Sequence, residues 1–278
     1  MPPTRQEIWN ARFSGDYIWG DGRSVTLSNG RWTDESENSG LSRPYAEIAY
    51  DYVALGDIDK DQVAEAVVVL NESGGGSGQF RHLVLFDRTD GKVTQRDSIL
   101  IGDRVQVKSI HIEPSRLTAE IVDQGDMDGA CCPGEIVRLT WPFTDGHFGE
   151  PTEVVLGKLY PAAMNGSVWK LKSWTAKSPI PQEANITITF EGGGFIGDDG
   201  CNQYRAPVEE GDRHGTFSVG LIATTRRACE EPLMQVERQF LERLAASNSM
   251  SFSPEHLNLG YKVKEDDGFM EFEQQLSK

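Results

Sequence analysis

The sequence lacks the features that mark a membrane-spanning chain. No apolar run approaches the roughly 20 residues that a transmembrane helix needs, and the longer runs, such as 66–70, cover only a few residues. The first residues, MPPTRQEIW, contain no apolar core of the kind found in signal peptides. We therefore expect no membrane-spanning segment. The N-terminus alone leaves two locations open, the cytoplasm or an exported chain whose leader has been removed.

Positive charge is also scarce. The 278 residues include 27 Lys and Arg against 43 Asp and Glu, which gives a net charge of −16. A surface with this charge repels nucleic acid phosphates and anionic lipid head groups. We therefore expect no nucleic acid partner. Hydrophobic residues still make up 38% of the chain, which is enough to build a core, so the chain is expected to fold.

Common catalytic motifs are missing as well. The five histidines are scattered and form no H-E-x-x-H pair, and no G-x-S-x-G elbow occurs. The glycine-rich run 74–78 lacks the Lys-Ser/Thr of a phosphate loop, so it predicts a flexible hairpin loop instead. We predict a protein that is not an enzyme and whose partner is an unidentified protein or small molecule. A hydrolase that uses clustered aspartates around a metal is a further alternative.

Strand-like segments dominate what is present. Short runs such as AVVVL, HLVLFD and NITITF alternate with turn signals such as Asn29-Gly30 and Asp90-Gly91. Strands joined by short turns pair antiparallel, because parallel pairing needs long crossover connections. The predicted fold is therefore mainly β with minor α.

One helix is expected near residue 232. Pro232 suits a first helical turn, and Glu230 and Glu231 are favourable beside the positive end of a helix. Apolar residues then recur at helical spacing, which predicts a helix that ends near Ala246. A weaker helical pattern covers residues 4–12.

A change in composition between residues 150 and 165 predicts a domain boundary. Pro, Gly and small residues follow a strand-like block there, and a new strand pattern begins at Ser167. We therefore expect a β-rich domain over residues 1–160 and a second domain over residues 161–278.

Short motifs in a fixed order over about residues 165–262 carry a family resemblance. They are WKL at 169–171, ITITF at 186–190, GCNQY at 200–204, FSV at 217–219, TTR at 224–226, Cys229 and Phe240-Leu241. This region resembles the META domain family, which includes the HslJ-like proteins. The resemblance implies an antiparallel β-barrel-like domain with one helix laid against it. It also implies a bacterial chain that is often exported or lipid-anchored, with loose links to stress tolerance and no established reaction.

The first domain is similar to an uncharacterised domain that precedes META-like modules in some bacterial envelope proteins. The similar pieces are GDID at 56–59, GGSG at 75–78, GDRV at 102–105 and CCP at 131–133. Together the two resemblances imply a periplasmic or extracellular protein with a binding or stress-protection role. The alternative is an inhibitor or interaction module for secreted proteases, which would display Asp198, Asp199 and Asn202 on an exposed loop over residues 197–213.

The sharpest local signal is the segment GDIDKDQVAEAVVVL. Asp57, Asp59 and Asp61 alternate in it, and Glu65 stands at the ninth position counted from Asp57. Calcium takes about six to eight oxygen ligands, which clustered carboxylates and a backbone carbonyl can supply. The pattern resembles the calcium loops of FG-GAP-type β repeats and the first half of an EF-hand. We therefore predict a calcium ion held by Asp57, Asp59, Asp61, the carbonyl of Val63, and Glu65.

The loop departs from that pattern at its sixth position, where glycine is usual and this chain has Gln62. A left-handed backbone at Gln62 would cost about 1–2 kcal/mol. Another cation, or a solvated acidic turn without any ion, is the alternative. Three carboxylates within five residues repel one another, however, which is costly without a counter-charge.

The four cysteines fall into two pairs. In an oxidising compartment, Cys201 and Cys229 could close a loop of about 28 residues and contribute on the order of 3 kcal/mol. Two buried thiols are the alternative. Cys131 and Cys132 are adjacent in the sequence. A structural turn is favoured there over a vicinal disulfide or a soft-metal site, because neighbouring residues on a strand point in different directions.

Overall fold

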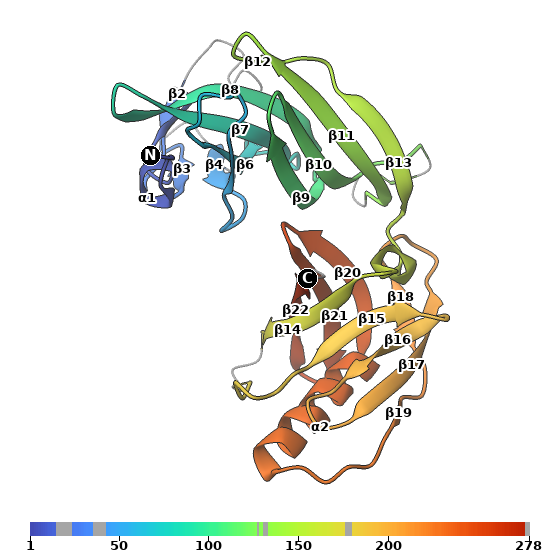
Figure 1. The fold of residues 1–278 in the computed structure, drawn as a ribbon. Helices are drawn as coiled ribbons and strands as arrows, with labels where there is room; N and C mark the ends of the chain where they lie inside the picture. Colours follow the sequence, from blue (N-terminus) through green and yellow to red (C-terminus); the bar gives the residue numbers. More distant parts are fainter. Residues whose placement is uncertain (15–23, 36–42, 127, 130–132, 176–179, 276–278) are drawn as a thin grey trace. The chain divides into compact units, whose positions relative to one another are not determined.

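The computed structural model describes residues 1–14, 24–35, 43–126, 128–129, 133–175 and 180–275 (Figure 1). These residues form mainly antiparallel strands with little helix, so the predicted fold class is confirmed. The chain divides into two compact units. The N-terminal unit comprises Met1–Pro133 and Val137–Leu156, and the C-terminal unit comprises Gly134–Ile136 and Gly157–Lys278. The boundary at residue 160 between two domains stays a prediction.

Two sheets build most of the N-terminal unit. The first has the order β3-β4-β6-β7-β8 with β5 paired to β6, and its strands are β3 (Arg31–Thr33), β4 (Tyr45–Ile48), β5 (Ala54–Gly56), β6 (Glu65–Ser73), β7 (Phe80–Thr89) and β8 (Lys92–Asp103). The second has the order β12-β11-β10-β9 with β13 paired to β11, and its strands are β9 (Gln106–Glu113), β10 (Arg116–Asp123), β11 (Glu135–Thr144), β12 (His147–Phe148) and β13 (Thr152–Lys158).

A short helix and a small sheet complete this unit. Helix α1 (Arg5–Ile8) precedes the paired strands β1 (Arg12–Ser14) and β2 (Ser24–Thr26). The Thr4 hydroxyl oxygen accepts from the Glu7 N–H, and the Glu7 carboxylate accepts from the Thr4 N–H. This reciprocal capping fixes the start of the helix. The weak helical pattern over residues 4–12 is thus confirmed in position, but the helix is shorter than predicted.

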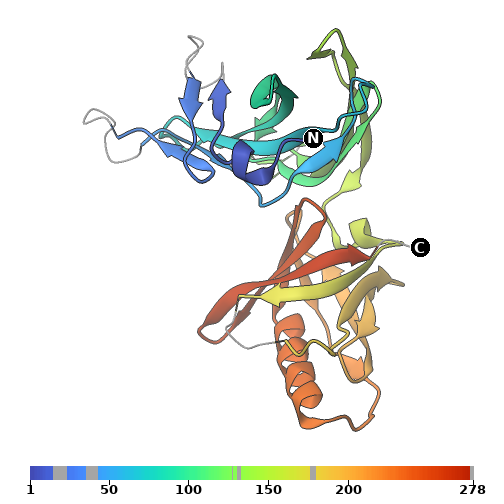
Figure 2. The ribbon, with the colours of Figure 1, turned by 60° about the vertical axis from the view of Figure 1, so that its left-hand side comes forward.

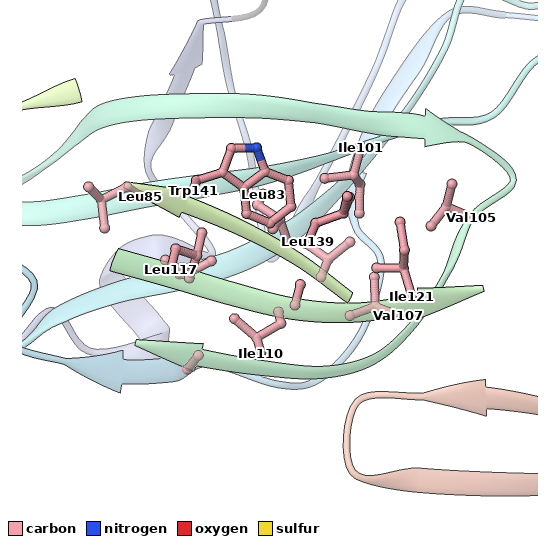
Figure 3. Close-up of a cluster of buried hydrophobic side chains, with 14 of the residues drawn as sticks. Leu83, Leu85, Ile101, Val105, Val107, Ile110, Leu117, Ile121, Leu139 and Trp141 are labelled. Atoms are coloured by element: carbon pink, nitrogen blue, oxygen red, sulfur yellow. The ribbon is translucent and has the colours of Figure 1, made fainter. Parts of the chain in front are cut away.

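The core of the N-terminal unit lies on both faces of the first sheet. Side chains alternate along a strand, so Val67 and Val69 of β6 join one cluster while Val68 and Leu70 join another. Burial on both faces explains the continuous apolar run AVVVL. Figure 3 shows the cluster that both sheets supply, which includes Leu83, Ile101, Leu139 and Trp141.

The C-terminal unit is one large antiparallel sheet. Its order is β18-β17-β16-β15-β14-β22-β21-β20, with β19 paired to β17. A bridge between Thr216 and Ser249, and a hydrogen bond from the Met250 N–H to the Gly215 carbonyl, nearly close it into a barrel. The strands are β14 (Val168–Trp174), β15 (Thr187–Glu191), β16 (Gly194–Asp198), β17 (Gln203–Glu210), β18 (Phe217–Val219), β19 (Ala223–Thr224), β20 (Ser247–Ser253), β21 (His256–Val263) and β22 (Asp266–Gln275), preceded by the 3-10 helix η1 (Pro161–Met164).

Helix α2 (Glu231–Ala245) packs against this sheet at β21 (Figure 2). Its bounds lie within one residue of the prediction. Its buried face includes Val236, Phe240 and Leu244, and the Phe240 ring meets the Tyr204 ring edge-on with 5.4 Å between centroids. In the part of the chain that the structure describes, no helix is long and apolar enough to cross a membrane.

Two predictions about loops have different outcomes. The glycine-rich run 74–78 joins the antiparallel strands β6 and β7, so the predicted hairpin loop is confirmed. The prediction of an exposed loop over residues 197–213 is wrong, because most of that segment belongs to the paired strands β16 and β17. Asp199 and Asn202 are 0% and 4% exposed, and their side-chain oxygens accept from backbone N–H groups, Asp199 from Cys201 and Asn202 from Arg227.

Candidate metal centre

The acidic segment forms the loop that connects β5 to β6. Gly56, the last residue of β5, pairs with Glu65, the first residue of β6, so the base of the loop is closed by antiparallel pairing. A Cβ atom at Gly56 would lie 2.7 Å from the Ile112 side chain and 2.8 Å from the Ile112 carbonyl oxygen. The glycine therefore lets β9 approach the entrance of the loop closely.

The three aspartates converge in space. Asp57, Asp59 and Asp61 each offer one carboxylate oxygen, and these oxygens all lie within 4.8 Å of one another. Asp57 and Asp59 are partly buried, whereas Asp61 is exposed. Carboxylate oxygens at this spacing could hold a metal ion.

The same carboxylates also shape the backbone of the loop. Asp57 accepts from the N–H groups of Asp61 and Gln62, at 3.1 and 3.0 Å, and Asp61 accepts from the Val63 N–H at 2.7 Å. Lys60 and Gln62 both have φ of 70°, the left-handed region. The conformation expected at the sixth position is therefore present, although no glycine stands there, and about 1–2 kcal/mol of strain follows.

The other two predicted ligands lie differently. Glu65 is only 2% exposed, and its Oε2 accepts from the Ile58 N–H at 2.8 Å. Burial raises the pKa of Glu65, and the three aspartates raise it further, while the Ile58 N–H acts in the opposite direction. Glu65 is not among the three carboxylates that converge. The roles of Glu65 and of the Val63 carbonyl as ligands stay predictions.

Arg96 of β8 supplies a counter-charge that sequence reasoning did not find. Its Nη1 lies 2.6 Å from Asp59 Oδ2 and 3.9 Å from an Asp87 carboxylate oxygen, and its guanidinium carbon is 5.2 Å from the centre of the Phe143 ring. The hydrogen bond to Asp59 raises the pKa of Arg96. Because Arg96 is 37 residues from Asp59, no local sequence pattern could pair them. A bound cation would share Asp59 with this guanidinium.

Only one of the two cysteine pairs lies within the described residues. The sulfur atoms of Cys201 and Cys229 are 2.11 Å apart and their Cα atoms 6.0 Å apart, which is disulfide spacing. Cys131 and Cys132 lie outside the described residues, so the structural turn expected there stays a prediction.

A second polar cluster surrounds Cys201, and no local sequence pattern predicts its structural role. The Asn202 Oδ1 accepts from the Arg227 N–H at 2.6 Å and from the Thr225 hydroxyl at 2.8 Å, while its Nδ2 donates to Glu237 of α2 at 2.9 Å. Asp199 Oδ1 accepts from the N–H groups of Cys201 and Asn202. These bonds tie the β16–β17 turn to the segment that leads into α2.

Comparison with known proteins supports one of the two resemblances. No curated protein matches the chain. One similar solved structure is titled "NMR structure of the protein from Burkholderia xenovorans"; it is 23% identical, with a TM-score of 0.34, over 43% of this chain and 90% of that chain. The resemblance of the N-terminal region stays a prediction. Residues 162–275 match the META domain family, which confirms the resemblance predicted for the C-terminal part of the chain.

Proposed function

We propose that the protein is a non-enzymatic binding or stress-protection protein of the bacterial envelope, with a calcium ion stabilising its N-terminal unit. The match to the META domain suggests a stress-related or envelope-associated role. The observation that carries the calcium part is the convergence of three aspartate oxygens within 4.8 Å. The META domain is not a known enzyme family, which favours binding over catalysis.

A periplasmic or extracellular location is part of the proposal. The spacing of Cys201 and Cys229 is compatible with it, because disulfides persist in oxidising compartments. The alternative role as an inhibitor of secreted proteases has less support. Two of the residues that were expected to enter a protease cleft, Asp199 and Asn202, are buried.

The ion would act by neutralising charge. Asp57, Asp59 and Asp61 would hold it, with the Val63 carbonyl and Glu65 as further ligands. In its absence, Arg96 neutralises only part of the three negative charges, since it bonds to Asp59 alone among them. Calcium should therefore stabilise the folded loop more than the unfolded chain, in which the carboxylates are far apart.

Thermal unfolding with and without calcium tests this role. With a dissociation constant of about 0.1–1 mM, as in extracellular calcium modules, about 5 mM calcium should stabilise the fold by roughly 1–2 kcal/mol over EDTA. The melting temperature should rise accordingly. Asp59→Ala should abolish this rise, because it removes one of the converging carboxylates.

Asp87→Asn is the matched control. It removes the other carboxylate near Arg96 but leaves the three converging aspartates intact, so its response to calcium should equal that of the wild type. Identical wild-type melting curves in calcium and EDTA would refute the calcium site. A response that survives in Asp59→Ala would place the ion elsewhere.

A further inference from the structure

A groove of about 680 Å³ lies in the N-terminal unit, between the edges of its two sheets. One wall is residues 97–101 of β8, the last strand of the first sheet. The other wall runs from the end of β12 into β13, through residues 148–151 and 153. The volume lies in the range of about 300–1,000 Å³ that is typical of ligand sites.

The β8 wall is an unpaired strand edge. In the described part of the chain, β8 pairs only with β7, so its outer edge has no strand partner. The Phe148 N–H donates to Asp97 Oδ2 at 2.7 Å, which joins the two walls at one end. The Gln95 side chain accepts from the Ser14 N–H and donates to the Ser14 carbonyl, which holds the neighbouring part of β8. The Ser98 N–H donates to Asp97 Oδ1 at 2.9 Å. The stretch 99–101 therefore remains open, and an open edge is a template for one more strand.

The floor of the groove is the hydrophobic core itself. Ile101, Leu139 and Trp141 line it, and each is less than one-tenth exposed. These three side chains lie together in the cluster of Figure 3. Leu100 stands at the rim and is 41% exposed. An occupant that matches this groove must offer backbone hydrogen bonds and apolar side chains at once, as an extended peptide does.

The charge of the rim selects among peptides. Asp97, Glu150 and Glu153 line the groove, so three carboxylates border an apolar floor. Glu150 and Glu153 have no ion pair with any other described residue. His147 lies beside Asp97, with its Nδ1 3.7 Å from Asp97 Oδ2. Lysine or arginine side chains would complement this rim.

We propose that this groove binds an extended basic peptide segment, which adds to β8 as a new edge strand. Its alternate apolar side chains would contact the floor at Leu139 and Trp141, and its basic side chains would reach Asp97, Glu150 and Glu153. This inference deepens the proposed binding role by naming the class of partner. It does not depend on calcium, because none of the three converging aspartates lines the groove.

Fluorescence anisotropy with a labelled Lys-Val repeat of about ten residues tests the proposal on the full chain in EDTA. Saturable binding is expected. The same peptide with prolines at two central positions should bind at least about tenfold more weakly, because proline cannot donate a backbone hydrogen bond. A Glu-Val repeat should not bind. Absence of saturable binding by the Lys-Val repeat, or equal binding of the proline peptide, would overturn strand addition.

Charge-reversal variants distinguish binding at the groove from non-specific attraction to the net charge of −16. Glu150→Lys with Glu153→Lys should weaken binding at least about tenfold, because both changes put like charges at the rim. Glu209→Lys with Glu210→Lys makes the same change in net charge at exposed positions of β17 and should weaken binding less than about twofold. Equal weakening by the two variants would reduce the interaction to non-specific attraction.

Hydrogen exchange locates the peptide. Binding should slow exchange of backbone amides within residues 99–101, and protection confined to other segments would overturn the assignment. Self-association through β8 would appear as dimers in light scattering of the free protein and would make a second copy the occupant. If the peptide tests fail but calcium still raises the melting temperature, only the peptide site is refuted. If the protein binds the peptide but calcium does not raise its melting temperature, only the calcium site is refuted.

Discussion

Both units contain an aspartate-rich turn between antiparallel strands: the loop 57–65 between β5 and β6, and the turn 198–202 between β16 and β17. In the first, the carboxylates gather near the surface and their oxygens converge. In the second, Asp199 is fully buried and bonds to backbone N–H groups of its own turn. Aspartate thus forms a candidate ion site in one unit and a buried, hydrogen-bonded turn in the other.

The neighbours of each turn account for the difference. The second turn contains Gly200 at φ +99°, and Cys201 and Asn202 connect it to the segment before α2. The first turn is held by Arg96 of β8 and by the Ser115 N–H, which donates to the Ile58 carbonyl at 2.8 Å, and its own carboxylates hold Gln62 in a left-handed conformation. Runs of aspartate alone therefore do not identify a cation site. What matters is whether the carboxylate oxygens converge near the surface, as in the first turn, or are buried, as Asp199 is in the second.

The largest expected effect concerns the anchor of the second turn. Replacing Cys201 and Cys229 together by serine should lower the free energy of unfolding by about 3–4 kcal/mol, because a bridge over 28 residues restricts the unfolded chain. Denaturant unfolding of the oxidised protein measures the loss. The response of the variant to calcium should be unchanged, since the loop 57–65 lies in the other unit. Equal stability of the two proteins would show that the cysteines are not bonded.

The next largest effect concerns Arg96. Arg96→Gln should lower stability in EDTA by about 1–2 kcal/mol, because it removes a charged hydrogen bond to Asp59. It should also enlarge the rise in melting temperature caused by calcium, since the ion no longer shares Asp59 with a guanidinium. Arg116→Gln is the control, because its pair with Glu113 is exposed and belongs to no cluster. A smaller calcium response in Arg96→Gln would mean that Arg96 helps to shape the site instead of competing for it.

The sequence was sufficient for the features that depend on local patterns. The helix from residue 231 to 245 follows from its apolar spacing and Pro232, and the convergence of Asp57, Asp59 and Asp61 follows from their alternation in a tight loop. Long-range partners were out of reach. Arg96 joins Asp59 from a strand that sheet topology brings close, and nothing around either residue encodes that approach.

Long-range partners are also the reason that the prediction for residues 197–213 is wrong. The run DDGCN has the composition of an exposed turn, and its polar residues were expected to face solvent. Burial became possible because Thr225, Arg227 and Glu237 supply hydrogen-bond partners to Asn202 from later in the chain. A buried polar residue cannot be recognised from sequence when its partners come from distant segments.

A smaller effect should follow from adding a glycine to the first turn or removing the glycine from the second. Gln62→Gly should stabilise the protein by about 0.5–1 kcal/mol, because relief of left-handed strain exceeds the added entropy of the unfolded chain. Gly200→Ala should destabilise it by about 1 kcal/mol for the converse reason. Denaturant unfolding of both variants checks the signs. Loss of stability in Gln62→Gly would mean that the Gln62 side chain contributes to the loop.

The smallest effect at neutral pH is expected at Asp199. Burial raises the pKa of Asp199, and the charges of Glu237 and Asp198 raise it further, against the N–H groups of Asn202 and Cys201. The folded state therefore binds protons more readily than the unfolded chain, and stability falls as pH rises from the unfolded pKa to the folded one. Asp199→Asn keeps an acceptor for both N–H groups and removes the charge.

This variant should be slightly more stable than the wild type at about pH 7, and the gain should vanish below the unfolded pKa of about 3.9, where the wild-type carboxyl is neutral. Denaturant unfolding across this pH range measures both, with Glu209→Gln on the exposed surface of β17 as the control for net charge. A gain that does not depend on pH would come from packing instead of charge. A loss at neutral pH would mean that the turn needs an ionised Asp199.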